Sequence, residues 1–142
     1  MRTSARNQFP GRVSELRKGA VNDEIELDIG SGQKIVATVT RESTQSLGLS
    51  VGSQAFALVK ASSVILVTEE EGVKFSARNH LHGTVARVTP GAVNSEVILD
   101  LQGGLSIAAI VTNESIKLLD LKPGAQASAM FKVSNVIIGV RT

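Results

Sequence analysis

The sequence contains the same pattern twice, at a constant offset of 72 residues, and no other feature restricts its possible folds so strongly. The string SARN at residues 4–7 returns at 76–79, and GAVN at 19–22 returns at 91–94. Aligning the two copies needs no gap and gives roughly 30 identities. The chain is therefore a tandem duplication. We expect two copies of one small domain, at 1–70 and 71–142, joined by a short acidic stretch.

Each copy shows the apolar periodicity of strands. Ile25, Leu27 and Ile29 alternate with acidic residues, which is the period of a half-buried strand. Four more strands are predicted at 11–16, 35–39, 55–59 and 64–67. One short helix is predicted over 40–49, because Thr40 suits an N-cap and Gly48 suits the end of a helix.

Five strands and one short helix in about 65 residues predict an all-β protein of two tandem small OB-fold-like five-stranded β-barrels. A two-sheet sandwich with the same number of strands is the structural alternative. A barrel of this size buries only about 60% of its unfolded surface. We therefore expect self-association to bury the remaining apolar surface.

Composition excludes several classes of protein. The 142 residues include no cysteine, so there is no disulfide, no thiolate nucleophile and no cysteine-bound zinc. The longest apolar run, Val136–Val140, is far shorter than the ~20 residues that cross a bilayer. Met1 is followed by polar residues rather than by the apolar core of a leader. We expect a cytoplasmic protein without a membrane partner.

The polar residues kept in both copies predict what the chain binds. Each copy keeps one arginine, one lysine and several hydroxyls, and no histidine. Ser4 and Arg6 share one face of an extended strand, and Thr40 and Ser43 flank the N-terminus of the predicted helix. Lys60 ends an apolar strand. Hydrogen-bond donors with a charge of about +2 complement a small dianion.

The strings TSARN, GAVN, T-x-x-S before LGL, and LVKASSV resemble the molbindin (Mop) domain, a small molybdate-binding module of OB-like fold. With two copies, the chain is similar to the di-Mop molbindins of bacterial molybdenum homeostasis. The resemblance implies an intracellular, non-enzymatic protein for molybdenum storage and homeostasis, with molybdate or tungstate as ligand and no organic cofactor. It also implies a homotrimer with the oxyanion at interfaces between Mop domains.

The same resemblance implies which residues bind the oxyanion through hydrogen bonds and charge, with no metal held by direct side-chain coordination. A serine, an arginine, a lysine and the residue after that lysine come from one domain, and a threonine and a serine come from a neighbouring domain. These are Ser4, Arg6, Lys60, Ala61, Thr40 and Ser43 in copy one, and Ser76, Arg78, Lys132, Val133, Thr112 and Ser115 in copy two.

The family also has oxyanion sites of a second kind. The candidates here are the GAVN turns, formed by Gly19, Ala20, Val21 and Asn22 and by Gly91, Ala92, Val93 and Asn94. The alternative interpretation of these residues is a Gly/Asn turn with no ligand.

A single-stranded nucleic-acid-binding OB module is the alternative function. Such modules stack bases on aromatic rings, whereas this chain has four phenylalanines and no Trp or Tyr. Phe56 and Phe131 lie in apolar strands that favour the core, so we expect no nucleic-acid partner. An enzyme is disfavoured too, because His80 and His82 occur only in copy two and no paired carboxylate motif flanks them.

Overall fold

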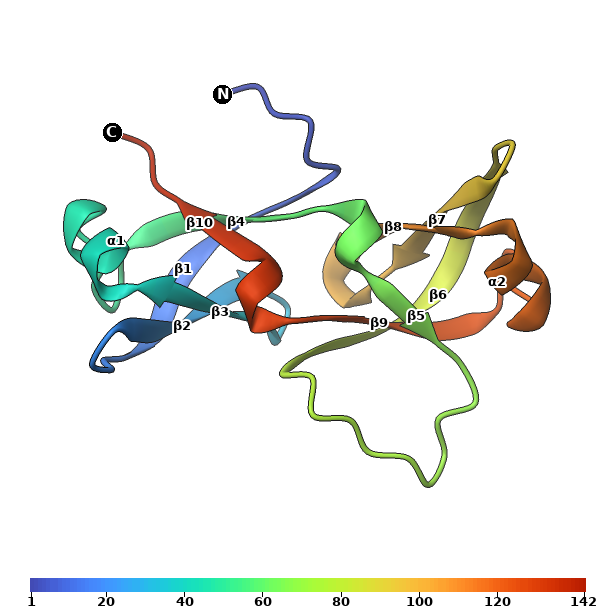
Figure 1. Ribbon diagram of the computed structural model, residues 1–142, viewed down its shortest axis with the longest axis horizontal. Helices are drawn as coiled ribbons and strands as arrows, with labels where there is room; N and C mark the ends of the chain where they lie inside the picture. Colours follow the sequence, from blue (N-terminus) through green and yellow to red (C-terminus); the bar gives the residue numbers. More distant parts are fainter. The chain divides into compact units, whose positions relative to one another are not determined.

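The computed structural model describes residues 1–142 and separates them into two compact units (Figure 1). Unit 1 comprises Met1–Val59 and Lys132–Thr142, and unit 2 comprises Lys60–Phe131. Each unit contains one five-stranded sheet in which all neighbouring strands are antiparallel. The units divide the chain differently from the repeats at 1–70 and 71–142, because each sheet contains one strand from the other repeat.

The sheet of unit 1 has the strand order β10-β4-β1-β2-β3. A short helix follows β3, and a 3₁₀ turn precedes β10. The elements are β1 (Asn7–Arg17), β2 (Asn22–Gly30), β3 (Gln33–Thr40), α1 (Arg41–Ser46), β4 (Gln54–Val59), η3 (Val133–Asn135) and β10 (Val136–Gly139).

The sheet of unit 2 has the equivalent order β5-β9-β6-β7-β8. Its elements are η1 (Ala61–Ser63), β5 (Ile65–Val67), β6 (Asn79–Pro90), β7 (Asn94–Asp100), η2 (Gln102–Gly104), β8 (Ser106–Thr112), α2 (Asn113–Leu118) and β9 (Gln126–Phe131). None of the helices in the chain is long and apolar enough to cross a bilayer.

The predicted all-β fold is confirmed. The alternation in β2 buries Ile25, Leu27 and Ile29 on one face, as the period of two requires. The sandwich alternative does not form, because each unit has a single sheet. In unit 1 the edge strands β3 and β10 approach each other, so this sheet curls into a partly open barrel.

The first strand of each repeat is long because it pairs with two neighbours in succession. Residues Asn7–Arg12 of β1 pair with β4, and residues Arg12–Arg17 pair with β2. A β-bulge between Val13 and Glu15 marks the change of partner. In β6 an equivalent bulge lies between Val85 and Arg87. Bulges bend a strand and increase its twist, which lets one strand serve both sides of the barrel.

The last strand of each sheet is exchanged between the repeats. In Figure 1, β10 from the end of the chain lies beside β4, with Val136 opposite Val59. In unit 2, β5 pairs with β9, with Ile65 opposite Met130. Val136 is buried in unit 1, and Leu66 of β5 is buried in unit 2. Each core therefore contains side chains from both repeats.

Gly11 and Gly83 occupy equivalent positions before the two bulges, and both lack room for a side chain. A Cβ on Gly11 would collide with the backbone oxygen of Asp28, and one on Gly83 would lie 2.5 Å from the backbone oxygen of Asp100. We predict that Gly11→Ala and Gly83→Ala each lower the free energy of unfolding by about 1–3 kcal/mol, because the strand must shift away from its neighbour.

Urea unfolding followed by circular dichroism measures this loss. Gln8→Ala, on the exposed face of the same strand, is the control, and we expect it to change stability by less than about 0.5 kcal/mol. Glycine variants as stable as Gln8→Ala would contradict the close approach of the strands.

Candidate functional site

Thr40 and Thr112 cap the two helices, as predicted for Thr40, and the capping geometry is the same in both repeats. The backbone N–H of Ser43 donates to Oγ1 of Thr40 at 3.1 Å, and that of Ser115 donates to Oγ1 of Thr112 at 3.1 Å. The two hydroxyls of each pair lie 2.7 Å and 2.9 Å apart. Both threonines are exposed at the helix end, so each repeat holds a hydroxyl pair in a fixed geometry at its surface.

The GAVN turns lie next to these caps. Asn22 is opposite Thr40 in the register of β2 and β3, and the N–H of Arg41 donates to the carbonyl of Val21 at 2.9 Å. In the second repeat the N–H of Asn113 donates to the carbonyl of Val93 at 2.9 Å. The GAVN turn and the Thr–Ser pair therefore occupy the same end of each unit. The proximity arises from register and could not be read from residue spacing.

Asp23 links the first turn to helix α1, and sequence reasoning missed it. The carboxyl is buried and accepts a hydrogen bond from the N–H of Gly19 at 3.1 Å. Hydrogen bonding from Thr44 lowers the pKa of Asp23, burial opposes this, and the Gly19 N–H with the charges of Arg41 and Lys18 lowers it further. The net pKa lies below the ordinary value, so Asp23 is an ionised group that fixes the turn.

The second repeat stabilises the same turn with neutral groups. Ser95 replaces Asp23, and its hydroxyl donates to Oδ1 of Asn113 at 2.5 Å. The amide of Asn113 in turn donates to the carbonyl of Gly91 at 2.9 Å. The hydroxyl pairs of the two repeats thus have the same geometry, while the supports behind them differ in charge.

The arginine and lysine candidates lie where β1 begins and β4 ends. Ser4 and Arg6 precede Asn7, which is opposite Val59, and Val59 is followed directly by Lys60. Ser4, Arg6 and Lys60 are exposed, and Ala61, the first residue of η1, is buried.

The second repeat follows the same rule. Ser76 and Arg78 precede Asn79, which is opposite Phe131, and Lys132 comes next in the chain. Ser76, Arg78 and Lys132 are exposed, and Val133, the first residue of η3, is half-buried.

Within one unit, these groups lie at opposite ends of the sheet from the hydroxyl pair. In unit 1, Arg6 adjoins the start of β1, whereas Thr40 lies across β2 from its end, because Arg17 pairs with Glu24 and Asn22 pairs with Thr40. A strand of 11 residues spans on the order of 30 Å. The fold therefore does not bring Arg6 and Thr40 of one unit to a common ligand.

Unit 1 has two cavities, and only the smaller one lies next to residues predicted to bind an oxyanion. A cavity of about 150 Å³ beside α1 is lined by Lys18, Asp23 and Arg41 among others. It adjoins the GAVN turn, but the Asp23 carboxylate is unfavourable for an anion there, and the second repeat carries Pro90, Ser95 and Asn113 at these three positions.

A larger cleft of about 800 Å³ contains none of the predicted oxyanion ligands. Its walls include Pro10, Asp28, Phe56 and Arg141, and the Arg141 guanidinium lies 6.0 Å from the Phe56 ring centroid. The predicted oxyanion ligands therefore do not coincide with this cleft.

The phenylalanines are mostly unavailable for stacking on bases. Phe9 and Phe131 are buried, and Phe56 is half-buried against Gly139. Phe75 is exposed, but it lies in the loop before β6 rather than on a sheet.

Comparison with known proteins places both repeats in one domain family. The TOBE domain model matches residues 3–66 and 76–138. The chain is 46% identical over 140 residues to the molybdenum transport protein ModE of Azotobacter vinelandii, and 44% identical over 140 residues to the molybdenum-pterin-binding protein MopA of Rhodobacter capsulatus. These matches cover 99% of this chain but 52% and 53% of the relatives, so the chain spans about half the length of the curated relatives it matches.

A solved structure matches over the full length. It is that of the cytoplasmic molybdate-binding protein ModG with molybdate bound, and it is 52% identical in sequence with a TM-score of 0.96. The match covers 99% of this chain and 100% of that one. The two-domain OB-like fold is therefore shared by both proteins.

The ionised Asp23 makes unit 1 sensitive to acid. Because the pKa of Asp23 is lower in the folded chain than its ordinary value of 3.8, its stabilising effect is complete above that value and is lost as the pH falls through the folded pKa. We predict that Asp23→Asn lowers the urea midpoint at pH 7 and that the difference from wild type shrinks at pH 3.

Glu71→Gln is the control, since Glu71 is exposed in the loop before β6. An equal loss of stability for Asp23→Asn at both pH values would mean that the side chain acts by packing and not through its charge.

Proposed function

The chain belongs to the TOBE domain family through both of its repeats, and we propose that it is an intracellular molybdate- or tungstate-binding protein for molybdenum storage and homeostasis. The repeats at 1–70 and 71–142 are the two Mop domains along the sequence, and each gives its last strand to the sheet of the other. The observation that carries the proposal is the full-length match to molybdate-bound ModG, together with identical capped hydroxyl pairs in both repeats.

The position of the donors supports a site shared between domains. Thr40 with Ser43, and Thr112 with Ser115, lie at one end of their units, while Arg6 and Arg78 adjoin the other end. One oxyanion is small compared with a sheet, so it receives both sets only where opposite ends of two domains meet. A closed homotrimer supplies such interfaces. Binding then depends on assembly.

The mechanism is binding without chemical conversion, and no organic cofactor takes part. The arginine and lysine supply about two positive charges against the two negative charges of molybdate. Hydroxyls and backbone N–H groups, including those of Ala61 and Val133, supply further donors. Sulfate has the same charge and shape, so selection rests on the size of the cavity. The GAVN turns are the candidates for the second kind of oxyanion site.

We predict that calorimetric titration with molybdate saturates at two or more anions per chain, and that excess sulfate leaves this unchanged. Fixed donors of a given spacing fit the larger anion and leave gaps around the smaller one. Absence of heat from a correctly assembled protein would contradict the proposed function, and titration with a labelled single-stranded oligonucleotide would then test the alternative.

Paired substitutions locate the site. We predict that Arg6→Gln with Arg78→Gln weakens molybdate binding by about 10- to 100-fold, because each removes a charged hydrogen-bond donor worth about 1.5–3 kcal/mol. Lys34→Gln is the matched control: Lys34 is an exposed cation that pairs with Glu26 at 3.5 Å, and the second repeat has Ser106 in its place. Equal molybdate affinity in the arginine variant and the control would show that the arginines do not bind the anion.

The oligomeric state has its own test. Light scattering is expected to give three times the chain mass of 14.9 kDa. Molybdate at 100 times its dissociation constant is expected to add about 2.7 kcal/mol of stability per site by mass action. A monomer that still binds molybdate would refute the shared site and leave the ligand assignment intact.

A further inference from the structure

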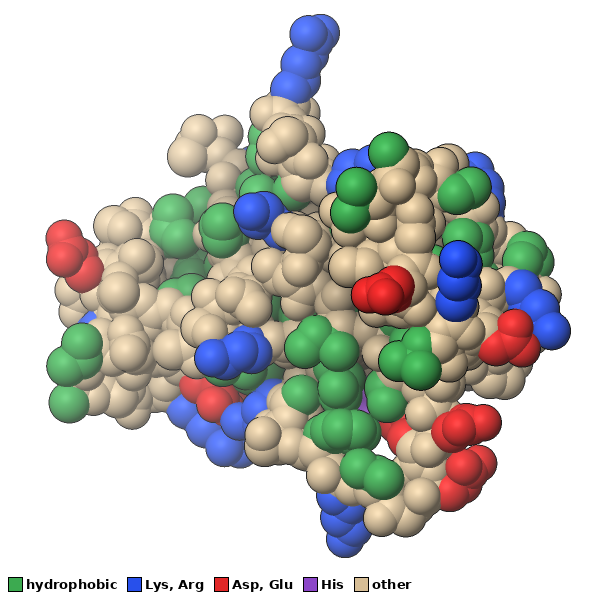
Figure 2. Space-filling model, turned by 45° about the vertical axis from the view of Figure 1, so that its right-hand side comes forward, with side chains coloured by type: hydrophobic (Ala, Val, Ile, Leu, Met, Phe, Trp, Pro, Cys, Tyr) green, Lys and Arg blue, Asp and Glu red, His purple; other side chains and the backbone are tan.

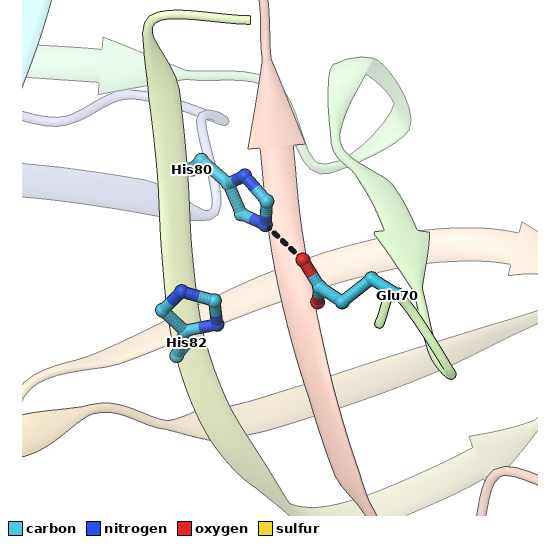
Figure 3. A group of neighbouring side chains, drawn as sticks. All are labelled: Glu70, His80 and His82. Carbon is cyan, nitrogen blue, oxygen red and sulfur yellow. Dashed lines mark ion pairs between the residues drawn. The ribbon is translucent and has the colours of Figure 1, made fainter. Parts of the chain in front are cut away.

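Three side chains that commonly bind metals meet in unit 2, outside the proposed oxyanion donors. Figure 3 shows Glu70 from the loop between β5 and β6 facing His80 and His82 on β6. One ligand atom from each lies within 4.8 Å of the other two. The sequence alone left the histidines without a carboxylate, because Glu70 is ten positions away and only the fold returns it to β6.

The strand geometry fixes both imidazoles. His80 and His82 are two positions apart on β6, so they share its outer face, while Leu81 between them is buried. The two ring centroids are 4.9 Å apart and tilted by 38°. Two ring nitrogens on one rigid strand form the fixed half of a cation site.

Glu70 completes the group from a bent loop. Oε1 of Glu70 lies 2.8 Å from Nε2 of His80, which has almost no exposed surface and makes no hydrogen bond of good geometry. Glu69 and Gly72, on either side, have positive φ angles of 52° and 78°.

Ser128 on β9 orients the outer imidazole. It is buried opposite His82, and its Oγ lies 2.6 Å from Nδ1 of that ring. A ring that donates from Nδ1 to a hydroxyl carries its lone pair on Nε2, which is the usual arrangement behind a metal-binding histidine. The edge of Phe75 lies against His80, with centroids 6.0 Å apart, and shields that ring.

The first repeat has no counterpart of the two histidines or of Ser128. At the offset of 72 residues, Gln8, Pro10 and Phe56 stand where the second repeat has His80, His82 and Ser128. The group therefore does not belong to the duplicated oxyanion donors. It supplies one site per chain, and the equivalent positions of the first repeat serve as a control without these side chains.

We propose that Glu70, His80 and His82 bind one divalent transition-metal cation, of the zinc or nickel class, which fastens the loop after β5 to β6. Two imidazoles and one carboxylate suit these ions, and the remaining coordination positions take water. With metal–ligand distances of about 2.1 Å, the ligand atoms must approach to about 3–3.4 Å of one another.

The site is open to solvent on one side. His82 is exposed, and in the space-filling view histidine surface shows between hydrophobic and acidic side chains (Figure 2). Glu69 and Glu71 add negative charge beside Glu70 on the loop, which raises the local concentration of cations.

The test uses full-length protein without a histidine tag, freed of metal by chelation and kept free of molybdate. Calorimetry with Zn²⁺, and visible absorption with Co²⁺, are expected to show saturation at one ion per chain. His80→Gln and His82→Gln are expected to weaken binding at least 10-fold, and Ser128→Ala to weaken it about 10-fold through loss of orientation. Gln8→Ala in the first repeat is the matched control and leaves binding unchanged.

A second measurement reports on the loop. Zn²⁺ is expected to slow proteolysis between β5 and β6 in the wild type and not in His82→Gln, provided that the two have the same urea midpoint. Failure of Zn²⁺ to saturate at one per chain, or equal affinity in wild type and both histidine variants, would show that Glu70 and His80 form only an ion pair. Because molybdate is absent, these results do not depend on the proposed function.

Discussion

The pairing of one long bent strand with two neighbours determines how each unit displays its polar groups. β1 binds β4 along its first half and β2 along its second half, and the bulge after Val13 with the side-chain-free Gly11 allows the change. Because this strand runs the length of the sheet, it separates the segment before Asn7 from the helix cap at Thr40. β6 repeats the arrangement. Each unit therefore has two different polar ends, which suits ligands shared between domains.

The exchanged fifth strand imposes a second constraint. β10 supplies backbone hydrogen bonds to β4 together with buried Val136 and Ile138, and β5 supplies the same to β9 with buried Leu66. Neither repeat fills its own sheet, so the stability of each unit depends on residues of the other repeat. Lys60 and Lys132 stand at the two points where the chain leaves one sheet for the other. Each crossing from one unit to the other thus positions a lysine that is a candidate for oxyanion binding.

The two repeats agree at the caps and differ behind them. The Thr–Ser hydroxyl pairs have similar distances of 2.7 Å and 2.9 Å, yet a buried carboxylate supports the first turn and a Ser95–Asn113 pair supports the second. Away from the caps, the second repeat carries two histidines on β6 and Ser128 on β9, and the first repeat has none of these at the equivalent positions. This pattern is what we expect if duplicated oxyanion binding requires the caps, while other faces are free to acquire separate chemistry.

The duplication, the strands, the helix with its Thr40 cap and the family could all be predicted from the sequence. These features depend on local periodicity and on residue strings, which neighbouring residues along the chain decide. Three features could be seen only in the folded chain: the sheets that β5 and β10 join, the position of the GAVN turn beside the cap, and the approach of Glu70 to His80. Each of these depends on strand register or on the path of a loop, and both are set by contacts between residues far apart in sequence.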